Sequence, residues 1–230
     1  VIRSLTHLTD DWTSSLRVEE SAVRQVADGC VSAGSLLPEQ ADAVVAACSH
    51  PLTFIAGGPG TGKTHTAGML IRVLWESLPN DRKGALAISL AAPTGKAAAN
   101  LEASMRKSTS GIEGFPSLKG ETLHQLLGIG GRGTKGTIRD ISSDRVIVDE
   151  SSMIDIQLMG LLISAMKPGS HLVLMGDSHQ LAPVEAGSLF ADLVRHFGRS
   201  QGQLSAVVEL KHCLRAELRE VKSDKLLTLT

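Results

Sequence analysis

Eight consecutive residues have the composition and spacing of a phosphate-binding loop: Gly57-Gly58-Pro59-Gly60-Thr61-Gly62-Lys63-Thr64. Phosphates carry concentrated negative charge, and glycines let successive backbone N–H groups turn toward them with no Cβ in the way. The Lys63 ammonium would add a full charge for the outer phosphates, and the Thr64 hydroxyl could ligate Mg²⁺. The loop lies between a short apolar run and a helical pattern, which is the context that this chemistry needs. The sequence therefore predicts a site for ATP and Mg²⁺.

An acidic pair ends another apolar run, Val146-Ile147-Val148-Asp149-Glu150. In a parallel sheet, ligands bind beyond the carboxyl ends of the strands, so the pair would face the phosphate loop. We expect Asp149 to hold Mg²⁺, through a water, and Glu150 to orient and deprotonate the attacking water.

A polar segment, Gly176-Asp177-Ser178-His179-Gln180-Leu181, follows a further apolar run. The Gln180 amide could reach the γ-phosphate or the attacking water and so report whether ATP is intact. The alternative is a polar loop that is capped by Asp177.

Apolar runs alternate with helical patterns from residue 52 onward, and this alternation predicts an α/β phosphate-loop fold. It implies right-handed crossovers and a parallel sheet with helices on both faces. The predicted strands are Leu52–Ala56, Ala85–Ala91, Arg145–Val148, His171–Met175 and Val207–Leu210. The predicted helices run from Lys63 to Trp75, from the alanine-rich segment to Arg106, and over Ile156–Met166 and Gly187–Phe197.

The chain divides into a small helical segment, residues 1–35, and an ATP-binding lobe, residues 36–230. A helix is expected from Pro38 to about Ala47, and Lys107–Lys119 reads as a loop. Gly128–Ser143 predicts either a flexible loop or a small hairpin. Its basic side chains are candidates to contact DNA: Arg132, Lys135 and Arg139.

Composition limits the environment and the partners. The 230-residue chain has a net charge of −1, so nucleic acid would bind through local patches only. The three cysteines, Cys30, Cys48 and Cys213, fit neither a zinc site nor a disulfide framework, which favours the cytoplasm. No apolar run is long enough for a membrane span, and the start at Val1 rather than Met suggests a fragment.

Taken in order, these motifs resemble those of superfamily 1 DNA helicases, and most closely the RecD group, the α subunit of exodeoxyribonuclease V. Their first ATP-binding lobe is RecA-like. The phosphate loop is similar to motif I, Asp149–Asp155 to motif II, and Gly176–Leu181 to motif III. Four further segments match: Leu37-Pro38-Glu39-Gln40 (the glutamine motif), Ala91–Ala98 (motif Ia), Glu121–Leu127, and Leu210-Lys211-His212-Cys213-Leu214-Arg215 (motif IV).

The resemblance implies roles for further residues. Gln40 would read the adenine edge, and Arg215 would approach the γ-phosphate, although Leu214 stands where the family more often has an aromatic residue. Thr94, Lys96 and His124 would contact the DNA backbone without reading sequence. On the residues alone, Thr94 is more readily a helix cap and His124 a structural histidine, whereas Lys96 is equally well an exposed charge.

The resemblance also implies an activity: 5′-to-3′ DNA unwinding driven by ATP, in recombinational repair, with RecB- and RecC-like subunits as partners. The family's motifs V and VI are absent from this sequence. Because an arginine from a second lobe completes such sites, we expect this chain alone to bind Mg-ATP weakly and to hydrolyse it very slowly. The alternatives are a stand-alone RecD-like or conjugative relaxase-type helicase, and an ATP switch that moves nothing.

Overall fold

The computed structural model describes residue 5 and residues 18–130, 138–180, 189–199 and 205–213. Its centre is a six-stranded, all-parallel sheet with the order β3-β2-β4-β5-β1-β6. The strands are β1 (Leu52–Gly57), β2 (Ile88–Ala92), β3 (Gly120–Thr122), β4 (Arg145–Val148), β5 (His171–Gly176) and β6 (Ser205–Leu210).

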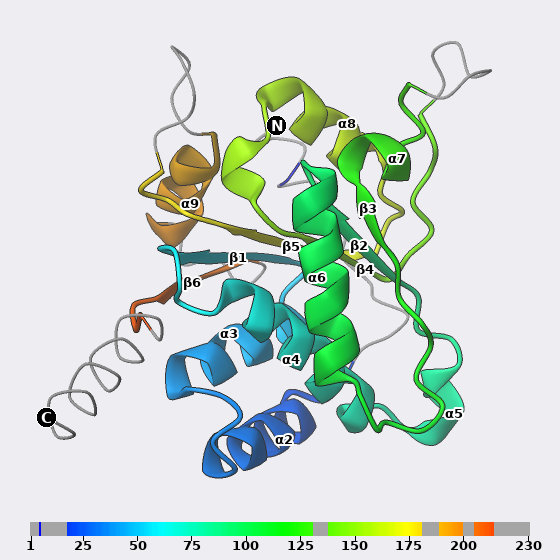
Figure 1. Cartoon of the computed structure of the whole chain (residues 1–230), viewed down its shortest axis with the longest axis vertical. Coiled ribbons are helices and arrows are strands. Elements are labelled where there is room, and N and C mark those ends of the chain that lie inside the picture. Colours follow the sequence, from blue (N-terminus) through cyan, green and yellow to red (C-terminus); the bar gives the residue numbers. More distant parts are fainter. Residues whose placement is uncertain (1–4, 6–17, 131–137, 181–188, 200–204, 214–230) are drawn as a thin grey trace, which may run out of the picture.

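Helices cover both faces of the sheet, as the sequence predicts (Figure 1). They are α2 (Glu20–Ser32), α3 (Pro38–Ser49), α4 (Lys63–Ser77), α5 (Asn80–Lys83), α6 (Gly95–Ser108), α7 (Leu123–Leu126), α8 (Ile156–Ala165) and α9 (Leu189–Arg199), with a 3₁₀ turn at Ser151–Met153.

Alternate strand residues feed two separate cores. In β1, Phe54 joins the cluster under α7, α8 and α9, while Ile55 joins the cluster under α2, α3, α4 and α6. Both side chains are fully buried, as expected for a parallel sheet that is covered on both sides. The two layers hold the strand ends, and hence the loops that follow them, in fixed positions.

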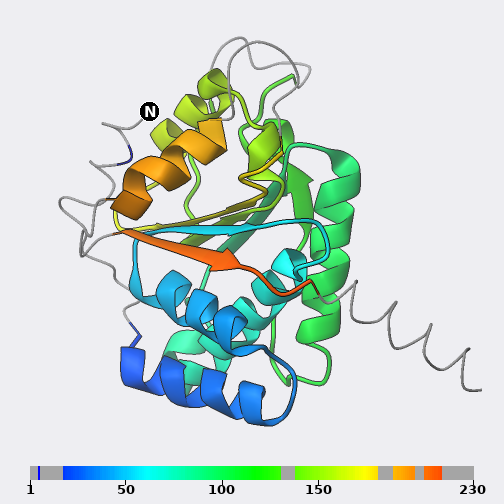
Figure 2. The ribbon, with the colours of Figure 1, turned by 90° about the vertical axis from the view of Figure 1, so that its left-hand side faces the viewer.

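The N-terminal helix α2 packs on the outside of α3 and α4 (Figure 2). Its Val23 and Ala27 are fully buried and belong to the same apolar cluster as the lobe itself. The expected helix over the first thirty residues is thus confirmed for Glu20–Ser32, whereas residues 1–4 and 6–17 lie outside the described part.

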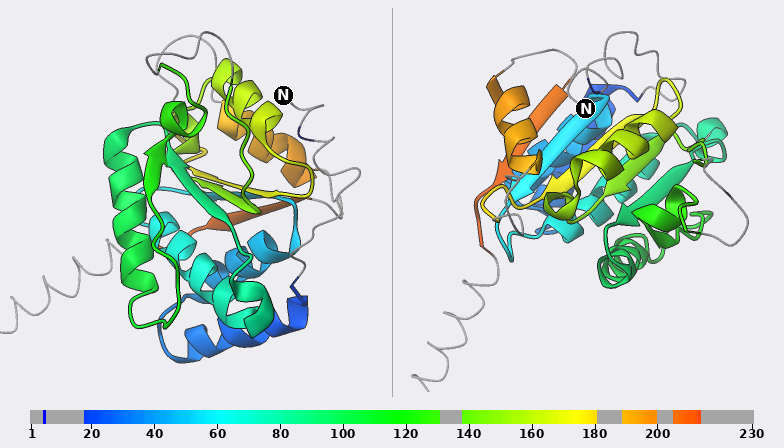
Figure 3. Two further views of the ribbon diagram at one scale, coloured as in Figure 1. Left: turned by 90° about the vertical axis from the view of Figure 1, so that its right-hand side faces the viewer. Right: turned by 90° about the horizontal axis from the view of Figure 1, so that it is seen from above.

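The predicted strands are all present, with shifted bounds. The second begins at Ile88 rather than Ala85, and the sequence did not predict β3, whose Gly120 pairs with Leu90 of β2. Figure 3 shows α6 alongside β2 and β3. None of the helices in the described ranges is long and apolar enough to cross a lipid bilayer.

Candidate nucleotide-binding site

The predicted site residues follow strands that end at one edge of the sheet. Because all strands are parallel, the segments after β1, β4 and β5 emerge side by side at their carboxyl ends. These segments carry the phosphate loop, the acidic pair and the Gln180 segment, in the neighbouring order β4-β5-β1. The topology therefore brings together three motifs that are far apart in the sequence.

The phosphate loop has a shape that only glycines adopt easily. Gly60 and Gly62 both have a φ of 86°, in the left-handed region. A Cβ on Gly57 would lie 2.7 Å from the Thr61 hydroxyl, which instead donates to the Gly58 carbonyl at 2.9 Å. The glycines thus allow the backbone conformation of the loop, as predicted from their spacing.

The first turn of α4 points its N–H groups into this loop. Gly62 is its N-cap residue, and no side chain caps the helix. The free amides and the helix dipole favour a bound anion at this end. The Lys63 ammonium donates to the carbonyls of Gly57 (2.7 Å) and Gly58 (3.1 Å), so it already lies over the loop that would hold the phosphates.

The loop and the acidic pair are in direct contact. The Thr64 hydroxyl donates to a carboxylate oxygen of Asp149 at 2.8 Å, although the two residues are far apart in sequence. Asp149 is buried, and its other oxygen accepts the Glu150 backbone N–H at 2.8 Å. Hydroxyl and carboxylate oxygens are ligands that Mg²⁺ prefers, with phosphates and waters completing the shell. Thr64 and Asp149 together therefore fit the predicted Mg²⁺ site.

Glu150 has an unusual backbone and an unusual acidity. Its φ of 53° places it in the left-handed region, and it is the only such non-glycine residue in the described ranges. Burial raises the pKa of its carboxyl, and the negative charges of Asp149 and Asp177 raise this pKa further, while Lys63 opposes them. A carboxylate with a raised pKa is a better proton acceptor, which suits the predicted general base.

The segment after β5 joins the acidic segment through side chains. The Ser152 hydroxyl lies 3.5 Å from the Gln180 amide oxygen, and Asp177 accepts the His179 backbone N–H at 2.9 Å. Asp177 is thus both a loop-capping group and a buried neighbour of the site. Gln180 is exposed and lies next to the acidic segment, where its predicted sensor role stays a prediction.

Gln40 has a role that the sequence did not predict. It is 1% exposed, its amide oxygen accepts the Leu37 N–H (3.0 Å), and its amide nitrogen donates to the Thr61 carbonyl (3.2 Å). Gln40 therefore ties α3 to the phosphate loop. Adenine reading stays a prediction.

The segment after β6 is fastened to the same region. The Glu39 carboxylate accepts the backbone N–H groups of Lys211 (3.0 Å) and His212 (2.9 Å), which lowers its pKa despite burial. The Cys213 thiol donates to the Pro59 carbonyl at 3.6 Å. Arg215 lies outside the described residues. The Glu39 contacts were missed because a sequence of this kind carries no signal for pairing across such a separation.

The predicted DNA contacts follow the two strands on the β3 side of the sheet, β2 and β3. Thr94 follows β2 and His124 follows β3, and these two strands are neighbours. Thr94 caps α6 by accepting the Ala97 N–H at 3.3 Å, so the helix-cap reading is confirmed. Thr94, Lys96 and His124 are all exposed. Of the basic residues after Gly128, Arg139 is exposed, whereas Arg132 and Lys135 lie outside the described residues.

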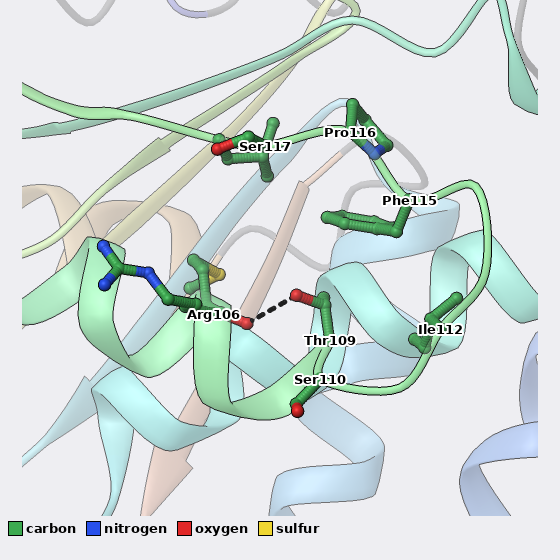
Figure 4. A pocket seen from close by; sticks show the side chains of 9 residues that line it. Arg106, Thr109, Ser110, Ile112, Phe115, Pro116 and Ser117 are labelled. Carbon is green, nitrogen blue, oxygen red and sulfur yellow. Dashed lines mark hydrogen bonds between the residues drawn. The ribbon is translucent and has the colours of Figure 1, made fainter.

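A separate cavity of about 290 Å³ lies at the end of α6 (Figure 4). Its lining includes Arg106, Thr109, Phe115 and Ser117, and it contains none of the predicted site residues. Thr109 donates to the Met105 carbonyl at 2.8 Å and closes the last turn of the helix there.

Comparisons with known proteins identify a family and several similar proteins. The AAA domain family matches residues 40–186. The RecBCD enzyme subunit RecD of Mycobacterium tuberculosis is 38% identical over 181 residues, which are 76% of this chain and 32% of that protein. The ATP-dependent RecD2 DNA helicase of Deinococcus radiodurans is 38% identical over 153 residues, 66% of this chain and 19% of that protein.

Among solved structures, the Pif1 helicase from Candida albicans has a TM-score of 0.50 at 23% identity, over 78% of this chain and 40% of that chain. This likeness concerns the fold. The chain spans about a third of the length of the RecD relative it matches.

Proposed function

Since this chain belongs to the AAA domain family and is of the RecD type within the superfamily 1 helicases, we propose that it is the ATP-binding lobe of a DNA helicase motor. Residues 36–230 would form this lobe, and residues 1–35 would be a helical attachment to it. The observation that carries the proposal is the 2.8 Å contact between Thr64 and Asp149, which joins the phosphate loop to the acidic pair.

In this proposal each group has a separate task. The loop amides and Lys63 bind the β- and γ-phosphates, while Thr64 and Asp149 hold Mg²⁺, which would draw charge from the phosphates when bound. Glu150 accepts a proton from the attacking water, since burial and the neighbouring acids raise its pKa. Gln180 and Arg215 monitor the γ-phosphate, and Gln40 holds the loop or reads the adenine.

The DNA strand would pass over the segments that follow β2 and β3, where Thr94, Lys96 and His124 are exposed. We propose a role in recombinational repair with RecB- and RecC-like subunits, because the RecD relative is named as a subunit of the RecBCD enzyme. The 5′-to-3′ direction of movement is proposed from the family resemblance. The cysteines Cys30, Cys48 and Cys213 are free, which supports a cytoplasmic setting.

The test uses the full-length protein that contains this chain. Steady-state ATP hydrolysis and unwinding of a forked duplex are measured with and without single-stranded DNA, for wild type, Gln180→Ala and Glu150→Gln. We expect DNA-stimulated hydrolysis in the wild type, retained ATP binding without unwinding in Gln180→Ala, and almost no turnover in Glu150→Gln.

Two results would overturn the proposal. If the wild type hydrolyses ATP at one rate with and without DNA, the motor reading fails. If the wild type hydrolyses ATP but does not unwind the duplex, and Gln180→Ala behaves in the same way, an ATP switch is the better description.

A further inference from the structure

A single hydroxyl connects α6 to the predicted magnesium ligand. The Ser104 hydroxyl of α6 donates to the Thr64 carbonyl at 2.9 Å. Thr64 lies in the first turn of α4, and its own hydroxyl donates to Asp149. A carbonyl oxygen has two lone pairs, so the Thr64 carbonyl accepts this bond beside its helical one. Any displacement of Ser104 therefore acts directly on the turn that holds the phosphate site.

The two helices also touch one turn farther along. A Cβ on Gly68 would lie 2.3 Å from the Ser108 hydroxyl oxygen, so only glycine fits where α4 passes α6. Gly68 follows Thr64 by one helical turn, as Ser108 follows Ser104. The helices thus run side by side, in the same direction and in register, with backbones in close approach.

A third contact fixes the far end of the pair. Phe115, in the loop after α6, lies edge-on to the Trp75 ring of α4, with ring centroids 5.0 Å apart. Figure 4 shows Phe115 over the cavity at this end of α6. Trp75 is buried. Contacts at the start, middle and end of α4 thus tie this helix to α6 and to the loop that follows α6.

The same helix α6 holds both predicted DNA-contact segments. Thr94 caps its first turn. On its other side, Glu102 accepts the Gly120 N–H at 3.0 Å, and a Cβ on Gly120 would lie 2.2 Å from the Ala98 carbonyl oxygen. Gly120 begins β3, which leads directly into α7 and His124. DNA bound to either segment would therefore act on the position of α6.

We propose that α6 transmits DNA binding to the ATP site, and that Ser104 is the positioning residue that does so. This inference rests on the proposed helicase function. Packed helices that shift as rigid bodies are an established carrier of coupling between sites. The specific claim is that the Ser104–Thr64 bond, and not merely the packing around it, sets how strongly DNA stimulates hydrolysis.

The test measures ATP hydrolysis by the full-length protein over a range of single-stranded DNA concentrations, for wild type, Ser104→Ala and Ser104→Thr. For Ser104→Ala we expect stimulation at saturating DNA to fall about fivefold, the value of one net hydrogen bond. The half-saturating DNA concentration and the rate without DNA stay within about twofold of wild type, a change well below one such bond. Ser104→Thr keeps a hydroxyl and restores stimulation.

A matched control removes a hydroxyl of the same kind elsewhere. Ser164 of α8 donates to the Gly160 carbonyl of its own helix, so Ser164→Ala should leave stimulation unchanged. Thermal denaturation of each variant checks the fold. A second variant, Gly68→Ala, forces the helices apart at the Ser108 contact and should also reduce stimulation.

The outcomes separate the inference from the proposed function. If the wild type shows no DNA stimulation, the helicase proposal fails and this inference fails with it. If the wild type is stimulated and Ser104→Ala is stimulated equally, the helicase proposal stands and the coupling role of Ser104 is overturned. Equal loss of the DNA-independent and DNA-dependent rates in Ser104→Ala would also overturn it, because Ser104 would then support the ATP site alone.

Discussion

Glu150 should lower the stability of the fold because of its backbone conformation. At a φ of 53° and a ψ of 37°, an L-residue is disfavoured by about 1–2 kcal/mol, whereas glycine is not. Glycine also loses about 0.4–1 kcal/mol through the greater freedom of the unfolded chain. Glu150→Gly should therefore be more stable than Glu150→Ala by about 1 kcal/mol, or 2–4 °C in Tm for a chain of this size.

The assay is urea unfolding of the two variants beside a control pair at Gly160. Gly160 lies within α8, and a Cβ there meets nothing within 4 Å. At that site the order reverses, and Gly160→Ala should gain about 0.5–1 kcal/mol. Equal stability of Glu150→Gly and Glu150→Ala, or the same order at both sites, would refute the claim of a strained backbone at Glu150.

Three further outcomes follow from the contacts. Glu150→Gln should stabilise the chain near pH 7, because a raised pKa means that the ionised carboxyl is disfavoured in the folded state. The gain in unfolding free energy should shrink as pH falls through this raised pKa and vanish below the ordinary pKa of a glutamate. A gain that grows in acid would contradict this prediction. Gly120→Ala should cost about 1–3 kcal/mol in urea unfolding through its clash with the Ala98 carbonyl; no loss would contradict the close approach. Gln40→Ala should cost about 1–3 kcal/mol of unfolding free energy, because the Leu37 N–H and the Thr61 carbonyl lose their partner. It should also weaken ATP-analogue binding in a fluorescence titration. Unchanged stability would show that the two bonds of Gln40 do not form.

The sheet could be predicted well from the sequence because its strands are buried on both faces. Leu52–Gly57 and His171–Gly176 are mainly apolar runs that end in glycine, and this pattern predicts a buried strand in each case. β3 was not, because Gly120-Glu121-Thr122 has no apolar residue and exists as a strand only through its pairing with β2. Local sequence carries no trace of such a tertiary contact.

The site followed the same rule. Lys63, Thr64 and Asp149 could be placed together because a parallel sheet fixes where their strands end. The side-chain ties around them could not. Glu39 accepts backbone N–H groups of a segment near the other end of the sequence. Gln40 binds the Thr61 carbonyl, whereas the family resemblance suggested that it binds adenine. Packing decides which partner a buried polar group finds.

The most direct test of the central claim is calorimetric titration of this chain with a non-hydrolysable ATP analogue, with and without Mg²⁺. The prediction is weak, Mg²⁺-dependent binding that falls at least about tenfold in Lys63→Ala, since hydrogen bonds to a charged group are worth about 1.5–3 kcal/mol. Denaturation of Lys63→Ala controls for its two bonds to the loop carbonyls. A folded Lys63→Ala that binds the analogue as tightly as the wild type, or a wild type that binds none, would contradict the account.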